Sequence, residues 1–307
     1  MHDLIIIGGS AAGASAGIYA MRRGLKPLII AGNLGGEVAT SGDIENWLGI
    51  AHTTGIELSG QFAAHLKSYN PEVLEGYTVT SLRKEGEGRF IVTTDDGKEH
   101  EARAVIVATG MHPRELGVPG EKDYRLKGVS YCTVCDGPLY GGKNVVTIGG
   151  GNSALESALM LADIAAQVTV VNKNPVFKGE QVLIDNLKAK ANVTILSEAM
   201  TTEIVGEPGG FAKGLKYQDK DGVEHELPFD GAFVHIGSTP NSSFLPSEVK
   251  KNAFGEIEVD LSGASSVPGI FAAGDVTSVP HKQIIIAAGM GSAAALSAVQ
   301  YLNRLSV

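Results

Sequence analysis

Apolar and small residues follow one another in blocks at the start of the chain. An apolar run, Leu4 to Ile7, leads into a glycine-rich turn, Gly8 to Gly13, and small residues continue to about Arg23. A second apolar run, Pro27 to Ile30, follows. Short apolar runs are typical of buried strands, and small residues between two of them indicate a closely packed helix. The pattern predicts a strand, turn, helix and strand of the size of a βαβ dinucleotide unit.

The same pattern occurs again in the middle of the chain. Strands are predicted at Asn144 to Ile148 and Gln167 to Val171, with a turn at Gly149 to Ala154 and a helix to about Ile164 between them. Backbone N–H groups at the start of such a helix bind pyrophosphate, and glycines let it approach. The second turn matches the G-x-G-x-x-G/A pattern, whereas the first has Ser10 at the middle glycine. Ordinary tight turns are the alternative, but two copies favour two bound dinucleotides.

The remaining pattern predicts sheets in both halves and a long helix, Gln283 to Asn303, that returns to the first domain because it needs a sheet to cover. The predicted fold class is therefore α/β, with two Rossmann-like, three-layer (ββα/βα) dinucleotide-binding domains, the second inserted into the first. The first domain is placed at 1–115 and 242–307, and the second at 116–241. Further strands are predicted at Tyr77 to Ser81, Phe90 to Thr94, Ala104 to Ala108, Asn192 to Leu196, Thr202 to Val205, Leu215 to Gln218 and Ala232 to Ile236.

Composition narrows the class of protein. The chain has 307 residues, 43% of them hydrophobic, which is enough for two packed cores. Its formal net charge of -9 is opposite in sign to that of a nucleic-acid binder. No export signal precedes Leu4, and the longest near-apolar run, Ile284 to Val299, is too short for a membrane span. We expect a cytoplasmic protein with no nucleic acid or membrane as partner, and a buried helix at 284–299.

The chain has only two cysteines, Cys132 and Cys135, in a C-x-x-C spacing. Such a pair can close a disulfide, and near a helix N-terminus one of its thiols becomes more acidic and reactive. Structural zinc needs four ligands, and the eight histidines form no second paired cluster, so redox chemistry is favoured over a metal site. Two inert buried thiols are the other alternative. Asp136, the next residue, is either a proton donor and acceptor for the thiols or a helix N-cap.

Several motifs together resemble those of the low-molecular-weight thioredoxin reductases, and the resemblance covers essentially the whole chain. It implies an FAD-dependent pyridine nucleotide-disulfide oxidoreductase. Such an enzyme passes electrons from NAD(P)H through FAD and a dithiol to the disulfide of thioredoxin or a thioredoxin-like protein. It also implies a cytoplasmic homodimer whose two domains rotate against each other. The motifs are Cys132-Thr133-Val134-Cys135-Asp136-Gly137, the glycine turn at 149–154, Thr109-Gly110, Gly274-Asp275, Gly35-Gly36, Glu45-Asn46-Trp47 and Lys282-Gln283.

The resemblance also assigns residues to both cofactor sites. Asp275 would accept hydrogen bonds from the ribityl hydroxyls of FAD, and Asn46 and Gln283 would face the flavin. Relatives often have glutamine at the position of Glu37. The FAD residues are implied to be Gly8, Ser10, Ala11, Gly13, Gly35, Gly36, Glu37, Asn46, Thr109, Gly110, Gly274, Asp275, Lys282, Gln283 and Ile284. The NAD(P)H residues are implied to be Gly149, Gly151, Asn152, Ser153, Ala154, Lys173 and Lys178.

The sequence leaves the electron donor open. An acidic residue after the second strand of a nucleotide unit binds the ribose of NADH, and arginines bind the 2′-phosphate of NADPH. This chain has Asn172-Lys173-Asn174 there, with Lys178 further on, and lysine lacks the planar fork of arginine. NADPH, NADH and reduced ferredoxin are the alternatives, although the glycine turn at 149–154 argues against ferredoxin.

The functional alternatives concern the partner and turnover. Cys135 is expected to face the flavin, and Cys132 to attack the disulfide of the partner protein. A weaker resemblance to the flavoproteins that reduce peroxiredoxins would change the partner and keep the chemistry. A flavin or nucleotide sensor that uses its dithiol as a redox switch would be reduced once and would not turn over.

Overall fold

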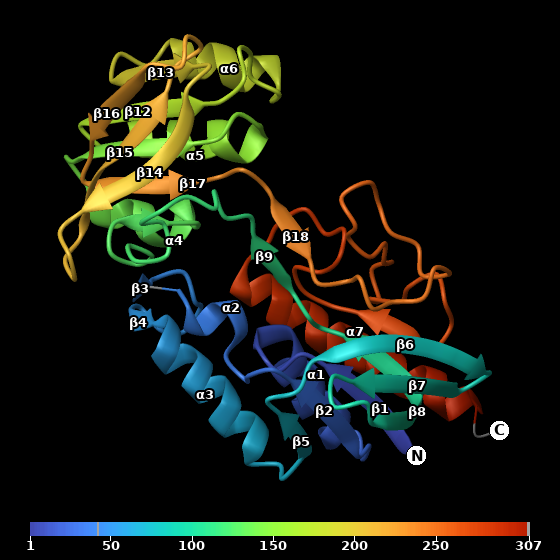
Figure 1. The fold of residues 1–307 in the computed structure, drawn as a ribbon. Coiled ribbons are helices and arrows are strands. Elements are labelled where there is room, and N and C mark those ends of the chain that lie inside the picture. Colours follow the sequence, from blue (N-terminus) through green and yellow to red (C-terminus); the bar gives the residue numbers. More distant parts are fainter. Residues whose placement is uncertain (42, 306–307) are drawn as a thin grey trace. The chain divides into compact units, whose positions relative to one another are not determined.

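The computed structural model describes residues 1–41 and 43–305. The chain divides into two compact units, one of Met1–His112 with Thr239–Val307 and one of Pro113–Ser238 (Figure 1). The second unit is therefore inserted in the first, and each predicted boundary lies three residues later in the chain than the observed one. The chain passes between the units in two short strands that pair with each other, β9 (Met111–Pro113) and β18 (Ser238–Pro240).

A seven-stranded sheet forms the middle layer of the first unit, in the order β5-β2-β1-β8-β7-β6 with β19 beside β8. The pairs among β5, β2, β1, β8 and β19 are parallel. The pairs of β7 with β8 and β6 are antiparallel. The strands are β1 (His2–Ile7), β2 (Pro27–Ala31), β5 (Glu72–Glu75), β6 (Val79–Gly86), β7 (Arg89–Thr94), β8 (Glu99–Val107) and β19 (Ile270–Ala272).

The central strands of this sheet are apolar along their length because both faces of the sheet are covered. Leu4 and Ile6 belong to the core on the face covered by α1, α3 and α7. Ile5 and Ile7 belong to the core on the other face, which is closed by β6, β7 and residues 245–276. The helices are α1 (Ala11–Arg22), α3 (Gly55–Lys67) and α7 (Ile284–Leu305), and the shorter elements are α2 (Gly36–Ala39), β3 (Asp43–Ile44) and β4 (Thr53–Thr54).

The second unit has the same three-layer construction. A parallel sheet in the order β10-β17-β11-β12-β13 packs on one face against α5 and α6, and on the other against the antiparallel sheet β14-β15-β16. The fold class predicted from the sequence is therefore confirmed. The elements are β10 (Val129–Ser130), α4 (Thr133–Asp136), the 3-10 helix η1 (Gly137–Tyr140), β11 (Asn144–Ile148), α5 (Asn152–Ala162), β12 (Gln167–Asn172), α6 (Gln181–Lys188), β13 (Val193–Ser197), β14 (Met200–Gly206), β15 (Ala212–Gln218), β16 (Glu224–Pro228) and β17 (Gly231–Val234).

Both units contain the same strand-to-helix turn. Gly8 and Gly149 each donate the backbone N–H to the carbonyl at the end of the next parallel strand, at 2.8 and 3.0 Å. Their φ angles are +111° and +146°, and a Cβ at either glycine would overlap a backbone carbonyl oxygen, that of Ala108 or that of His235. Ala108 and His235 themselves donate to the last residue of β1 and of β11, at 2.7 and 2.8 Å. The internal repeat therefore extends to individual backbone contacts.

The apolar pattern misses several elements that are only partly buried, although it predicts β13, which has no buried residue either. α6 has two buried residues, and neither β5 nor β16 has a buried one. α3 does carry a signal in the sequence, because Thr54 and Glu57 form a reciprocal capping box at its N-terminus. Some boundaries also differ, since the strand predicted at 104–108 is the second half of β8.

The prediction of a buried terminal helix is correct for one face of α7 only. Gly291, Ala294 and Ala298 are buried, whereas Ile285 and Leu296 are exposed. Within the described residues, α7 is the one helix that is long and apolar enough to cross a membrane by length and composition. Core helices pass the same test, and α7 packs on α1 and the sheet.

Gly291 lies where α7 crosses α1, and a Cβ there would overlap the carbonyl oxygen of Ala12. We expect Gly291→Ala to lower the free energy of unfolding by about 1–3 kcal/mol, because α7 must move away from α1. Gly289 has open space at its Cβ position, so Gly289→Ala should be neutral or stabilise by up to about 1 kcal/mol. Urea unfolding of both variants checks this, and equal effects would contradict the close approach of the helices.

Candidate active site

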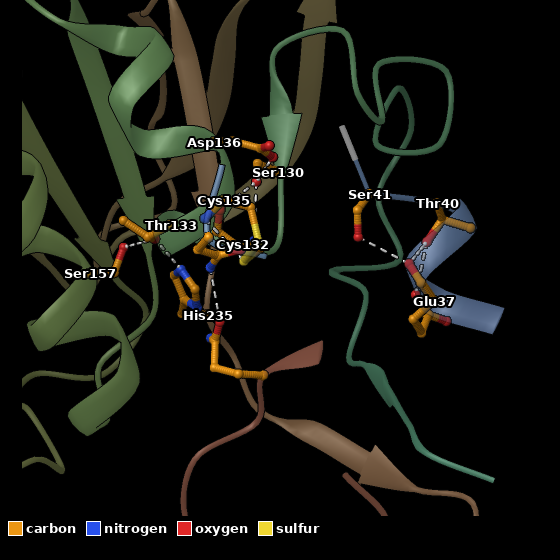
Figure 2. Close-up of a disulfide and its surroundings, with 12 residues drawn as sticks. Glu37, Thr40, Ser41, Ser130, Cys132, Thr133, Cys135, Asp136, Ser157 and His235 are labelled. Carbon is orange, nitrogen blue, oxygen red and sulfur yellow. Dashed lines mark hydrogen bonds between the residues drawn. A yellow bond between two sulfur atoms is a disulfide. The ribbon is translucent and has the colours of Figure 1, made fainter. Parts of the chain in front are cut away.

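Cys132 and Cys135 form a disulfide in the second unit (Figure 2). Cys132 is the N-cap residue of α4, and its sulfur accepts a hydrogen bond from the backbone N–H of Cys135 at 3.3 Å. The pair therefore lies at the N-terminus of a short helix. A backbone N–H directed at a sulfur stabilises the thiolate of a reduced pair.

Asp136 is buried directly beside the disulfide, at the end of α4. Its Oδ2 accepts a hydrogen bond from Ser130 Oγ at 2.5 Å, and the same Ser130 oxygen accepts the N–H of Cys132 at 3.1 Å. Ser130 thus joins the carboxyl group of Asp136 to the cysteine turn. Asp136 is also the N-cap residue of η1, as the alternative expected, but its side chain makes no capping hydrogen bond there. Its proximity to the cysteines is compatible with proton exchange.

A second polar cluster joins α4 to its neighbours, with Thr133 and Ser157 buried and His235 partly buried. Thr133 Oγ1 lies 2.6 Å from Ser157 Oγ of α5 and 2.8 Å from His235 Nε2, as the dashed lines in Figure 2 show. Burial lowers the pKa of His235 to about 4, so the imidazole is neutral at pH 7. Sequence analysis missed this cluster, because nothing in the pattern relates residues 133, 157 and 235.

The residues expected at the FAD pyrophosphate gather where β1 ends and α1 begins. Ser10 Oγ donates to the carbonyl of Gly35 at 2.6 Å, which ties the first turn to the segment before α2. A Cβ at Gly13 would overlap the carbonyl oxygen of Gly8. Ser10 therefore replaces the middle glycine of the pattern and links two loops.

Several of the other expected FAD residues make side-chain contacts elsewhere in the same unit. Asn46 Nδ2 donates to Gln283 Oε1 at 3.1 Å, and Lys282 Nζ lies 2.9 Å from Glu256 Oε1. Burial raises the pKa of Asp275, and Lys282 opposes this effect. The carboxylate of Glu37 pairs with Nδ1 of His112. Thr109 is joined to Asn241 by reciprocal hydrogen bonds of 2.7 and 2.8 Å.

Sequence analysis also missed a cavity in the first unit. It is open, has a volume of about 340 Å³ and lies between residues 33–39 and α3. Asn33 follows β2, at the position where a Rossmann unit holds a ribose, and its Oδ1 accepts the N–H of Gly35 at 3.0 Å. Because Asn33 closely follows a predicted strand, the sequence could have identified it as a candidate ribose-binding residue.

The turn at 149–154 opens α5 in the second unit. The Cβ position of Gly150 is filled by the amide of Asn172, whereas that of Gly151 is open. Asn152 and Glu180 exchange hydrogen bonds of 3.0 and 2.8 Å at the start of α5. Ser153 is exposed and Ala154 is buried beneath the turn. The space at Gly151 gives a ligand access to the helix N-terminus.

The segment after β12 is expected to contact the ribose of NADH or the 2′-phosphate of NADPH. Asn172 is buried, with its Nδ2 donating to the carbonyl of Val176 at 3.2 Å and its Oδ1 accepting the N–H of Asn174 at 3.2 Å. Lys173 and Lys178 are exposed. The side chain of Asn172 therefore shapes its own turn, and the exposed charges after it are the two lysines and Glu180. In the described part of the chain, no three His, Cys, Asp or Glu residues cluster as a metal site.

The fold and the site define a class of protein. The family model of the pyridine nucleotide-disulphide oxidoreductases matches residues 2–295, so the chain belongs to this family. FAD and NAD(P)H are the cofactors of the family, as predicted. The two turns fit dinucleotides, because each begins a helix and lacks the side chains that would block a pyrophosphate from the helix N-terminus.

Individual relatives agree with this assignment. An alkyl hydroperoxide reductase subunit of Escherichia coli (strain K12) is 43% identical over 307 residues, 99% of this chain but 58% of that protein. Thioredoxin reductase from Streptococcus pyogenes MGAS5005 is 34% identical, with a TM-score of 0.91 and 99% of each chain covered. That from T. acidophilum is 40% identical, with a TM-score of 0.67 and 99% of each chain covered. The resemblance to the low-molecular-weight thioredoxin reductases is confirmed.

The lowered pKa of His235 predicts an acid-sensitive contribution to stability. The unfolded chain takes up a proton near pH 6.5, but the folded protein does so only near pH 4. Relative to a His235→Gln variant, the free energy of unfolding of the wild type should therefore fall by about 2–3 kcal/mol between pH 7 and pH 4. Denaturant unfolding at several pH values measures this difference. A pH-independent difference would show that the imidazole titrates normally.

Proposed function

We propose that this chain is a flavoprotein disulfide reductase that passes electrons from NAD(P)H through FAD and the Cys132–Cys135 pair to thioredoxin or a thioredoxin-like protein. The position of the disulfide carries the proposal. It lies on α4, in the same unit as the glycine turn at 149–154, while the other glycine turn belongs to the first unit. A disulfide beside a nucleotide turn is suited to repeated reduction, which favours an enzyme over a sensor that is reduced once.

The first unit would hold FAD through the residues around the starts of α1 and α7. The backbone N–H groups of the 8–13 turn would bind the pyrophosphate. The Asp275 carboxyl would accept hydrogen bonds from the ribityl hydroxyls. FAD bound there would supply a hydride acceptor for the nicotinamide and an electron-pair donor for the disulfide. Asn46 and Gln283, which already bond to each other, would orient the flavin side of the site.

The reduced cysteines would divide the exchange with the partner between them. The Cys132 thiolate, stabilised by the N–H of Cys135, attacks one sulfur of the partner disulfide and forms a mixed disulfide, with the other partner sulfur leaving as a thiolate. The Cys135 thiolate then attacks Cys132 Sγ, which restores the Cys132–Cys135 bond and releases the second partner thiol. Asp136 is placed to take up or return a proton beside this pair.

The second unit would bind the nicotinamide dinucleotide at Gly149, Gly151, Asn152, Ser153 and Ala154. Lys173 and Lys178 favour NADPH because two positive charges near the end of β12 would attract a 2′-phosphate, as point charges rather than bidentate forks. NADH is the second candidate, since Asn172 is uncharged and bound within its own turn.

Gly151→Ala tests this site, because its Cβ meets open space in the protein but would stand in the approach to the helix N-terminus. We expect the variant to unfold like the wild type and to bind both NADPH and NADH at least about tenfold more weakly. Calorimetric titration of the FAD-loaded, oxidised protein measures both nucleotides, and the tighter one identifies the donor. Unchanged affinity for both nucleotides would remove the turn from the binding site.

The partner is proposed as thioredoxin or a thioredoxin-like protein, in a cytoplasmic homodimeric enzyme, on the similarity to thioredoxin reductases over the whole chain. A peroxiredoxin-type partner is the second candidate, because an alkyl hydroperoxide reductase subunit is 43% identical to this chain. This chain spans only 58% of that relative.

Replacement of Cys135 by serine separates the two halves of the reaction. In Cys135→Ser, NAD(P)H should still bleach the flavin, but the turnover of oxidised thioredoxin should fall to background because the mixed disulfide is not resolved. The wild-type protein, assayed with oxidised thioredoxin and with an oxidised peroxiredoxin, identifies the partner by the higher kcat/KM. Full activity of Cys135→Ser would exclude the dithiol from the mechanism.

A further inference from the structure

The Thr133, Ser157 and His235 cluster joins three elements of the second unit beneath the disulfide (Figure 2). Thr133 is the first residue of α4 and directly follows Cys132, Ser157 lies on α5, and His235 follows β17. Thr133 is buried, so its hydroxyl depends on these two partners rather than on water. The cluster therefore holds the turn that carries both cysteines.

The internal repeat shows that the fold does not require an imidazole at position 235. His235 occupies in the second unit the place that Ala108 occupies in the first, with the same backbone hydrogen bond and the same carbonyl against the first glycine of the turn. Alanine satisfies this backbone geometry in the first unit. The ring of His235 is thus an addition that reaches from the nucleotide turn to the cysteine helix.

We propose that His235 is a positioning residue for the disulfide, acting through Thr133. A threonine hydroxyl can donate one hydrogen bond and accept another, so Thr133 can be bound by Ser157 and His235 at once. The carbonyl of His235 packs on Gly149, so the cysteine helix is fixed to the segment that shapes the nucleotide turn.

Such a fixed position matters because α4 has only four residues. One helical turn is not stable by itself and needs side-chain anchors. A reaction between two groups of one molecule gains rate when their geometry is set in advance. The anchor is therefore expected to speed electron transfer from the flavin to the disulfide. This expectation rests on the proposed function.

The test compares Thr133→Val, which keeps the shape and removes the hydroxyl, with Thr133→Ser, which keeps the hydroxyl. His235→Leu and His235→Gln form the second matched pair, because the glutamine amide can still hydrogen-bond. The flavin of the FAD-loaded protein is reduced anaerobically by light with a sacrificial amine, without nucleotide. The return of flavin absorbance then measures electron transfer from the flavin to the disulfide. The transferred electron pair breaks the S–S bond and, with two protons, gives two thiols.

We expect Thr133→Val and His235→Leu to slow this return at least about tenfold, while Thr133→Ser and His235→Gln stay close to the wild type. Reduction of the same disulfide by free dithiothreitol should not slow in any variant, because a reagent from solution does not depend on a preset geometry. A general loss of structure would not produce this split or its rescue.

Wild-type rates in Thr133→Val and His235→Leu, or equal slowing of the flavin and dithiothreitol reactions, would overturn the positioning role. Equal defects in Thr133→Val and Thr133→Ser would do the same, since the hydroxyl would then be irrelevant. A wild-type protein whose reduced flavin never passes electrons to the disulfide would instead contradict the proposed function. The two failures are therefore distinguishable.

Discussion

Two close backbone contacts, at Gly8 and Gly149, are the constraint on which this structure depends. At each, a carbonyl oxygen from the residue after a neighbouring strand occupies the space that a side chain would need. Only glycine permits this approach at positive φ. The close approach brings the start of α1 or α5 to the carboxyl edge of its sheet, where helix N–H groups can meet a pyrophosphate. Both proposed cofactor sites depend on this one arrangement.

The second unit adds a disulfide to this arrangement by using polar contacts instead of a large core. The helix that carries the cysteines has four residues, and its neighbours hold it from two sides. Ser130 bonds to Asp136 and to the N–H of Cys132, and Thr133 bonds to Ser157 and His235. These contacts anchor the small turn that carries both sulfurs.

The sequence predicts the parts of this molecule that repeat or that are buried on both sides. Continuous apolar strands next to glycine turns identify both units, and a C-x-x-C pair identifies the chemistry. α6, β5 and β16 escape prediction because each buries too little to leave an apolar pattern. The His235 cluster escapes for another reason, since contacts between residues separated by 24 and 102 positions arise only in three dimensions.

The central claim is that nucleotide, flavin and disulfide form one path for electrons in a single chain. The most direct measurement is an anaerobic titration of the FAD-loaded protein with the nucleotide that bleaches it, with thiols counted at each addition. The account predicts that two thiols per chain appear as electrons are added, and that a Cys132→Ser variant takes up one electron pair fewer. Complete bleaching of the flavin with the Cys132–Cys135 bond still intact would contradict it.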